Sequence, residues 1–176
     1  MRNVVLYTAM SLDGYLADRD GGVGWLSGQD PNAEDPDTYA SFIRDVDTVL
    51  MGWNTYHQVT TELSPSVWPY HGLTSYVITH RALSSSEEIR FTQMEPCRLV
   101  CTLREASGRD IWICGGAEII RPLIEEDLID IYRISVIPVL LGGGKVLFDP
   151  VERPLALRLT GYQQGNGIVE LTYTRR

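Results

Sequence analysis

The sequence predicts an α/β fold in which helices flank a central mixed sheet, and two observations carry this prediction. Segments rich in Val, Ile and Tyr alternate with segments of helical periodicity, which is the order expected of an α/β sheet. The last two apolar segments flank a short connection with an Asn-Gly step, which is typical of an antiparallel hairpin that closes the sheet. We expect strands at residues 4–9, 48–51, 75–79, 98–101, 111–114, 131–136, 155–163 and 168–174.

A first helix is predicted to begin just after residue 35. Asp35 is a suitable N-cap, and Pro36 fits the first helical position because the backbone N–H that it lacks would have no partner there. Apolar side chains then recur at helical spacing and form one face, made of Tyr39, Phe42, Ile43 and Val46.

A second helix is predicted to begin at Gly115-Gly116. Its apolar face consists of Ile119, Ile120, Leu123, Ile124 and Leu128. Pro122 stands in the interior of this segment, where it removes one backbone hydrogen bond, so we expect the helix to bend there.

Length, composition and charge are those of one globular domain. The chain has 176 residues, of which 44% are hydrophobic and 22% charged, and we expect a single domain over residues 1–176. The 15 Lys and Arg against 23 Asp and Glu give a net charge of −8 without a basic cluster, so no nucleic-acid partner is expected. No leader pattern and no apolar stretch of the ~18 residues that a membrane helix needs is present, so we expect a cytoplasmic protein with no membrane partner.

Metal chemistry is not expected. The three histidines are scattered without the spacing of metal ligands, and the three cysteines form no CxxC pair. We expect buried thiols, with Cys114 as the one candidate for a reactive cysteine because it precedes two glycines.

Two junctions between a strand and a helix are candidate anion sites. Residues 111–118 pass through Gly115 and Gly116, and residues 50–56 pass through Gly52 to Asn54 and Thr55. Glycine lets backbone N–H groups approach a ligand, and a helix N-terminus favours phosphate, so two such junctions in one sheet suggest a shared anion. Neither has the spacing of a GxGxxG fingerprint, and a tight turn without a ligand is the alternative for each.

Three further segments attract attention. Thr79, His80 and Arg81 follow a strand, where the two potentially cationic side chains could meet a phosphate or form a solvated turn. The glycine-rich loop of residues 17–32 is long for a compact domain, and such loops are often functional. Residues 142–145, Gly-Gly-Gly-Lys, lack the spacing of a P-loop and are expected to form a flexible turn.

Four motifs in this order resemble the dihydrofolate-reductase-like superfamily. They are residues 11–17 (SLDGYLA), residues 50–56 (LMGWNTY), residues 114–117 (CGGA), and residues 128–130 (LID) together with residues 137–144 (IPVLLGGG). Within the superfamily the chain looks most like the C-terminal reductase domain of the riboflavin-biosynthesis bifunctional deaminase-reductase and its stand-alone relatives. The resemblance implies a three-layer fold with a central mixed sheet.

The resemblance also implies NADPH as the cofactor, lying across the carboxyl ends of the central strands. Ala9 and Leu16 would lie at the nicotinamide. The two helix starts would face the pyrophosphate, and the adenosine ribose with its 2′-phosphate would lie at the segment after the third strand. The residues so assigned are Gly52, Trp53, Asn54, Thr55, Thr79, His80, Arg81, Gly115, Gly116, Ala117 and Glu118.

For the substrate end, the resemblance places Trp25 on a mobile loop, residues 20–26, that closes over the site. Asp13, Trp25 and Thr38 are the catalytic candidates, and Trp25, Asp35, Thr38 and Phe42 are the substrate-binding candidates. Asp13 has the alternative of fixing the turn at Gly14, and Asp35 that of capping the helix.

Several positions depart from these families. Trp53 stands where folate reductases carry an Arg, and Thr38 stands where they carry a carboxylate. Against the riboflavin reductases, Cys114 replaces a Glu and Val59 replaces an Asp, and no zinc motif of a deaminase is present.

The sequence therefore predicts an NADPH-dependent reductase of a small heterocycle, with the ribosylaminopyrimidine step of riboflavin synthesis as the leading reaction by resemblance. Dihydrofolate reduction and a pterin- or nucleotide-binding protein without turnover are the alternatives. We also expect a homodimer, because residues 131–141 form a long apolar segment interrupted by Pro138 that would otherwise be an uncovered sheet edge, and relatives pair through this region.

Overall fold

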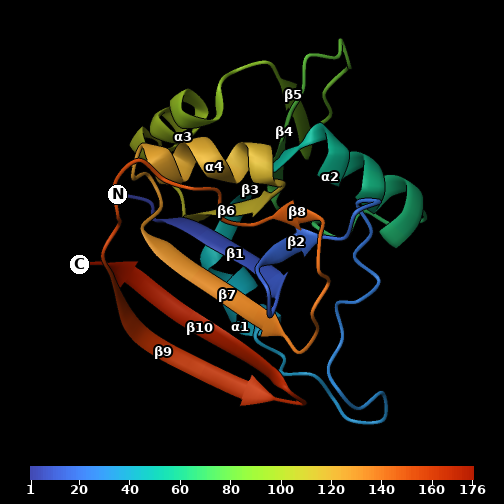
Figure 1. Ribbon diagram of the computed structural model, residues 1–176. Coiled ribbons are helices and arrows are strands. Elements are labelled where there is room, and N and C mark those ends of the chain that lie inside the picture. Colours follow the sequence, from blue (N-terminus) through green and yellow to red (C-terminus); the bar gives the residue numbers. More distant parts are fainter.

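The computed structural model describes residues 1–176, and an eight-stranded mixed sheet forms its centre (Figure 1). The strand order is β5-β4-β3-β6-β1-β7-β10-β9. The strands from β5 to β7 pair in parallel, and β10 pairs antiparallel with both β7 and β9. The predicted mixed sheet with a C-terminal antiparallel hairpin is thereby confirmed.

The eight strands are β1 (Val4–Ser11), β3 (Val46–Gly52), β4 (Thr74–Ile78), β5 (Ile89–Thr92), β6 (Asp110–Gly115), β7 (Ile131–Ile137), β9 (Leu157–Gly165) and β10 (Ile168–Arg175). The helices are α1 (Tyr39–Phe42), α2 (Trp53–Gln58), α3 (Pro96–Glu105) and α4 (Ala117–Glu125). Short helical turns, η1 (Ile43–Asp45) and η2 (Val59–Leu63), extend α1 and α2, and a separate two-stranded sheet pairs β2 (Tyr15–Ala17) with β8 (Lys145–Val146).

The helices cover both faces of the sheet, because alternate residues of each strand point to opposite sides. Val4 and Leu6 of β1 belong to the core beneath α3 and α4, which lie side by side in Figure 1. Val5 belongs to the second core, with Phe42 of α1 and Trp112 of β6. This is the three-layer arrangement that the sequence predicted.

The hairpin between β9 and β10 is tighter than the four-residue connection expected. Only Asn166 and Gly167 separate the strands, and their φ values of 47° and 78° are the positive angles that a two-residue type I′ turn requires. The Asn-Gly step therefore sets the register of the antiparallel end of the sheet.

The segment at residues 98–101 is helical, so the predicted strand there is wrong. It lies within α3, where Pro96 occupies the first turn and Leu99, Val100 and Leu103 are buried. A short apolar run is ambiguous between strand and helix, and packing against α4 decides the outcome here.

The first helix is shorter than predicted. Its N-cap is Thr38, with Asp35 and Pro36 outside the helix, and Val46 is the first residue of β3. The second predicted helix is confirmed as α4, which begins after Gly116 and continues through Pro122.

The expectation that residues 131–141 form an open sheet edge is also wrong. The strand ends at Ile137, and β7 pairs with β1 on one side and with β10 on the other. The edges of the sheet are β5 and β9, so the edge argument for a homodimer does not apply to β7. None of the helices combines the length and the apolar character that a membrane crossing needs.

Candidate functional site

A cleft of about 1300 Å³ opens at the carboxyl ends of β1, β3, β4 and β6. Ligands of open α/β sheets bind at this end of the strands. The structure brings twelve of the predicted cofactor residues into the lining of this one cleft: Ala9, Leu16, Gly52, Trp53, Asn54, Thr55, Thr79, His80, Arg81, Gly116, Ala117 and Glu118. Gly115, the remaining one, is the last residue of β6 and is buried behind them.

The two glycine junctions meet inside the cleft. A Cβ built on Gly52 would press on Cγ1 of Ile119 at 3.3 Å and lie 4.0 Å from the backbone nitrogen of Gly116, so glycine at this position lets α4 come close to the end of β3. A Cβ built on Gly116 would lie 3.7 Å from Oγ1 of Thr55, so the missing side chain of Gly116 leaves space between the start of α4 and the start of α2. The N-terminus of a helix such as α4 favours an anion, so the predicted shared anion site has a cradle of the right kind.

A cationic side chain also lines the cleft. The guanidinium carbon of Arg81 lies 4.6 Å from the centre of the Trp53 ring, and the backbone N–H of Arg81 donates to Oγ1 of Thr79 at 3.2 Å. No carboxylate lies within ion-pair distance of Arg81, so its charge is available to a phosphate. Trp53, which replaces a cation of the folate reductases, here supports another one.

The loop that follows β2 reaches the cleft with its first part only. Val23 and Leu26 line the cleft, and the side-chain amide of Gln58 on α2 donates to the carbonyl of Gly21 at 3.0 Å. Trp25 is not among the lining residues, because its indole N–H turns back to the carbonyl of Gly22 at 3.1 Å.

Asp13 lies outside the cleft lining, and its carboxylate is fully engaged by the protein. It accepts hydrogen bonds from the Ser11 hydroxyl at 2.6 Å and from the backbone N–H groups of Leu141 at 3.1 Å and Gly142 at 2.7 Å. These hydrogen bonds, that of Ser11 foremost, lower the pKa of Asp13. The carboxylate fastens the loop before β8 to the turn after β1, and its backbone partners are Leu141 and Gly142, whereas the N–H of Gly14 donates to the carbonyl of Ser11.

The predicted substrate residues are divided between surface and core. Asp35 is exposed and accepts from the side-chain amide of Asn166 at 2.6 Å, and Phe42 is buried against Tyr7 with a ring separation of 4.2 Å. Thr38 is buried, and its Oγ1 lies 2.9 Å from Tyr7 Oη and 2.5 Å from a carboxylate oxygen of Glu170. None of the three lines the cleft itself.

Sequence reasoning missed four polar residues. Lys145, the only lysine of the chain, lines the cleft from β8, and Tyr7, Arg133 and Glu170 form a polar cluster around Thr38. Glu170 could have been noticed in the sequence, because it is a charged residue at a buried position of β10 between apolar residues.

Cys114 and Tyr70 form the inner wall of the cleft. Their side chains lie 3.8 Å apart, and burial raises the pKa of the Cys114 thiol to about 11, although the Tyr70 hydroxyl acts in the opposite direction. Burial also raises the pKa of Tyr70. A raised pKa disfavours the thiolate, which is the nucleophilic form of a cysteine. The expectation of buried thiols is wrong for Cys101, which is exposed, and Cys97 and Cys114 are half-buried.

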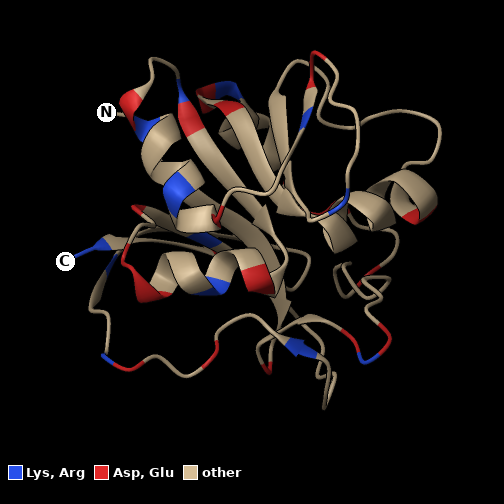
Figure 2. Cartoon of the chain, turned by 90° about the horizontal axis from the view of Figure 1, so that it is seen from above, with Lys and Arg blue, Asp and Glu red and all other residues tan.

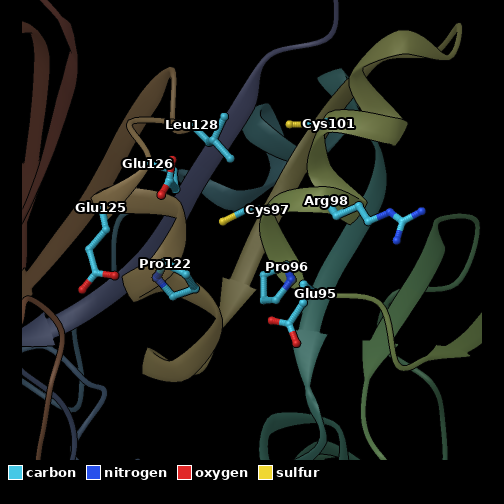
Figure 3. Close-up of a pocket in the computed structure, with 9 residues that line it drawn as sticks. All are labelled: Glu95, Pro96, Cys97, Arg98, Cys101, Pro122, Glu125, Glu126 and Leu128. Carbon is cyan, nitrogen blue, oxygen red and sulfur yellow. The ribbon is translucent and has the colours of Figure 1, made fainter.

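A second hollow, of about 390 Å³, lies between α3 and α4 (Figure 3). Glu95, Glu125 and Glu126 line it together with Arg98, so it presents mostly negative charge. Over the molecule as a whole, Lys and Arg are dispersed among Asp and Glu (Figure 2). The cleft lining also has more acidic than basic side chains, so what makes the cleft the better place for a phosphate-bearing ligand is the glycine junction at the start of α4.

Comparison with known proteins agrees with this geometry. The family model described as RibD C-terminal domain matches residues 2–169. An uncharacterized Bacillus subtilis (strain 168) protein, YwjB, is 39% identical over 175 residues, which cover 99% of this chain and 98% of that protein.

Three solved structures share the fold. A putative riboflavin biosynthesis protein from Shewanella sp. PV-4 superposes with a TM-score of 0.82 at 30% identity, covering 100% of this chain and 99% of the other. A deaminase/5-amino-6-(5-phosphoribosylamino)uracil reductase from Thermotoga maritima gives 0.71 at 14% identity, covering 99% of this chain and 57% of that one. Dihydrofolate reductase from Enterococcus faecalis, complexed with NADP(H), gives 0.66 at 16% identity, covering 99% and 96%. The chain has the dihydrofolate-reductase-like fold and belongs to the RibD C-terminal domain family.

Proposed function

We propose that this protein is an NADPH-dependent reductase of a small heterocycle, with a ribosylaminopyrimidine as the leading substrate. The observation that carries the proposal is that one cleft is lined both by Gly52, Thr55 and Gly116, which lie close together, and by Arg81, which lies over Trp53. An anion cradle and a separate cation match the central pyrophosphate and the 2′-phosphate of NADPH. The family membership and the Shewanella relative support the choice of pyrimidine chemistry.

The residues present fit this cofactor. The side-chain-free positions Gly52 and Gly116 would admit the pyrophosphate, with backbone N–H groups at the start of α4 as donors. Arg81, held on Trp53, would bind the 2′-phosphate, and Ala9 and Leu16 would lie at the nicotinamide. When bound, NADPH would supply a hydride to an electrophilic carbon of the substrate.

The chain itself contributes binding, orientation and exclusion of water. Leu16, Val23 and Leu26 give the cleft an apolar cover beside Ala9, and the hydrogen bond from Gln58 to Gly21 holds the loop against α2. Holding two reactants together in a site from which water is excluded supplies much of what a hydride transfer needs.

The test is steady-state oxidation of NADPH by the purified protein. We expect turnover with 5-amino-6-(5-phosphoribosylamino)uracil and none with dihydrofolate. Turnover of dihydrofolate instead would select the folate reaction. Tight NADPH binding with no turnover of either compound would identify a binding protein.

A further inference from the structure

A buried carboxylate lies in the sheet and accepts a hydrogen bond from Thr38, one of the predicted substrate residues. Glu170 on β10 is 2% exposed, and the other residues of this strand up to Thr174 are apolar or hydroxylic. Burying a carboxylate is unfavourable unless its charge is paired and its oxygens accept hydrogen bonds. The partners of Glu170 therefore show what the residue does.

The two carboxylate oxygens have different partners. Oε1 accepts from Nε of Arg133 at 3.0 Å and from Nη2 of the same guanidinium at 2.6 Å. Oε2 accepts from the Thr38 hydroxyl at 2.5 Å and, at 3.5 Å, from the Ser135 hydroxyl. The guanidinium thus holds one oxygen and leaves the other to hydroxyl groups.

This arrangement fixes the direction of a hydrogen-bond chain. An ionised carboxylate can only accept, so the single hydroxyl proton of Thr38 must point to Glu170. Oγ1 of Thr38 can then only accept from Tyr7 Oη, which lies 2.9 Å away. Burial raises the pKa of Tyr7, although the hydrogen bond to Thr38 lowers it, so Tyr7 is a neutral phenol whose single proton points inward.

Tyr7 is the least buried of the three hydrogen-bonded residues Tyr7, Thr38 and Glu170, although it is not among the residues that line the cleft. It lies two residues before Ala9 on β1, and alternate residues of a strand share one face. Thr38 and Glu170 are buried, whereas Tyr7 is half-buried and lies beside Tyr39, which is 37% exposed, at a ring separation of 6.2 Å. Because Tyr7 Oη gives its proton to Thr38, its lone pairs stay free to accept a hydrogen bond from a ligand.

We propose that Glu170, acting through Thr38, makes the Tyr7 hydroxyl an obligatory hydrogen-bond acceptor, so that the substrate presents a ring N–H at this point. The inference rests on the proposed function for the identity of the site. Glu170 and Thr38 are positioning residues, and Tyr7 is the residue that touches the ligand. A heterocycle that offers only a carbonyl or an N-methyl group there would leave Tyr7 Oη without a donor.

Two uracils that differ only at the ring nitrogens test this inference. 5,6-Diaminouracil has ring N–H donors, and 5,6-diamino-1,3-dimethyluracil has none. With the NADP⁺ complex of the wild-type protein, we expect calorimetry to show about tenfold tighter binding of the N–H compound. Tyr7→Phe should bring the ratio of the two dissociation constants close to one, whereas a preference based on methyl size alone would survive this substitution.

Glu170→Gln makes a sharper test because it reverses the direction of the hydrogen bonds that link Glu170, Thr38 and Tyr7. Arg133 still requires an acceptor, so the Gln carbonyl stays at the Oε1 position and its NH₂ group turns toward Thr38. Thr38 must then donate to Tyr7, and the Tyr7 proton turns toward the ligand. The variant should lose the preference for the N–H compound, and a merely structural role of Glu170 would weaken both compounds alike.

Thr38 supplies a matched pair of variants. Thr38→Ser keeps the hydroxyl and should keep the wild-type ratio of the two dissociation constants. Thr38→Val removes the hydrogen bonds to Tyr7 and Glu170 and should bring this ratio close to one. The NADPH dissociation constant, measured for every variant, should stay within about twofold of wild type because the cradle is elsewhere.

The outcomes separate the two proposals. Failure of the wild-type protein to bind NADPH overturns the proposed function. If NADPH binds, but the N–H compound does not bind or the ratio is unchanged in both Tyr7→Phe and Glu170→Gln, the inference about Tyr7 is overturned.

Discussion

The guanidinium of Arg81 lies over the indole of Trp53, with 4.6 Å between the guanidinium carbon and the ring centre. Such a cation–π contact contributes about 0.5–2 kcal/mol, depending on exposure. Trp53 therefore stands in place of a cation of the folate reductases that the sequence resembles, but it orients another cation, Arg81, in the lining of the same cleft.

We predict that the protein prefers NADPH over NADH by at least about tenfold, because one charge-assisted hydrogen bond to the 2′-phosphate contributes roughly 1.5–3 kcal/mol. Arg81→Ala should remove most of this preference and leave NADH binding nearly unchanged. Titration of both cofactors against wild type and variant gives the answer.

Arg90→Ala is the matched control, since Arg90 lies over the Tyr76 ring at 5.6 Å in a similar contact but does not line the cleft. It should leave both affinities unchanged. Equal losses of NADPH and NADH affinity in Arg81→Ala would show that Arg81 does not bind the 2′-phosphate.

Gly116→Val should weaken NADPH binding steeply while the protein stays folded. The φ of Gly116 is −74°, so backbone strain from a positive φ is not an issue, and a Cβ would point into the cradle toward Thr55. Gly161→Ala on β9, where a Cβ would meet only Thr172 Cβ at 3.9 Å, is the control. An unchanged NADPH dissociation constant in folded Gly116→Val would mean that the double glycine serves only the turn.

Arg2→Met should destabilise the fold by about 3 kcal/mol, the order expected when a buried charged group with several partners is lost. Arg2 is 6% exposed, donates to the carbonyls of Arg109 at 2.6 Å and Leu103 at 3.3 Å, and pairs with Asp47. Urea unfolding measures the change. Arg121→Met removes an ion pair with Glu125 in which the Arg121 side chain is 60% exposed, and it should change stability by less than about 0.5 kcal/mol. Similar effects of the two substitutions would contradict this account of Arg2.

We predict that the burial of Cys114 lowers the free energy of unfolding at alkaline pH. Burial raises its pKa from an ordinary 9.0 to about 11, so the folded state holds the thiol proton more tightly than the unfolded state does. The resulting stabilisation is complete below about pH 9 and is lost as the pH rises toward about 11. The free energy of unfolding of Cys114→Ala should fall less steeply across this window, and parallel pH profiles would show that the thiol is not responsible.

A homodimer remains our prediction, now with β9 as its proposed contact. This strand is a free edge of the sheet and exposes Leu159 (50%) and Tyr162 (68%). Sedimentation at micromolar concentration should give twice the chain mass of 19.8 kDa, and Leu159→Lys with Tyr162→Lys should give the monomer. A wild-type monomer at that concentration would contradict the prediction.

Elements whose residue pattern fits only one kind of secondary structure could be predicted from the sequence. The strands around Val4, Val49 and Ile111, the helix after Gly116 and the hairpin at Asn166-Gly167 each follow from periodicity or turn chemistry. The strand predicted at residues 98–101 failed because an apolar run of that length fits either a strand or a helix, and only contact with α4 selects the helix.

The candidate cofactor cleft could be predicted because its residues follow strand ends, and the parallel strands of one sheet bring those ends to one edge. The polar cluster that we propose to meet the substrate could not be predicted in this way. Tyr7, Thr38 and Glu170 come from β1, the start of α1 and β10, and no spacing in the sequence links them. The order of the strands places β10 beside β7, and this pairing brings Glu170 within hydrogen-bond distance of Arg133. A hydrogen bond requires its two atoms to lie about 3 Å apart. Residues far apart in the sequence can therefore form one only after the tertiary structure has brought them together.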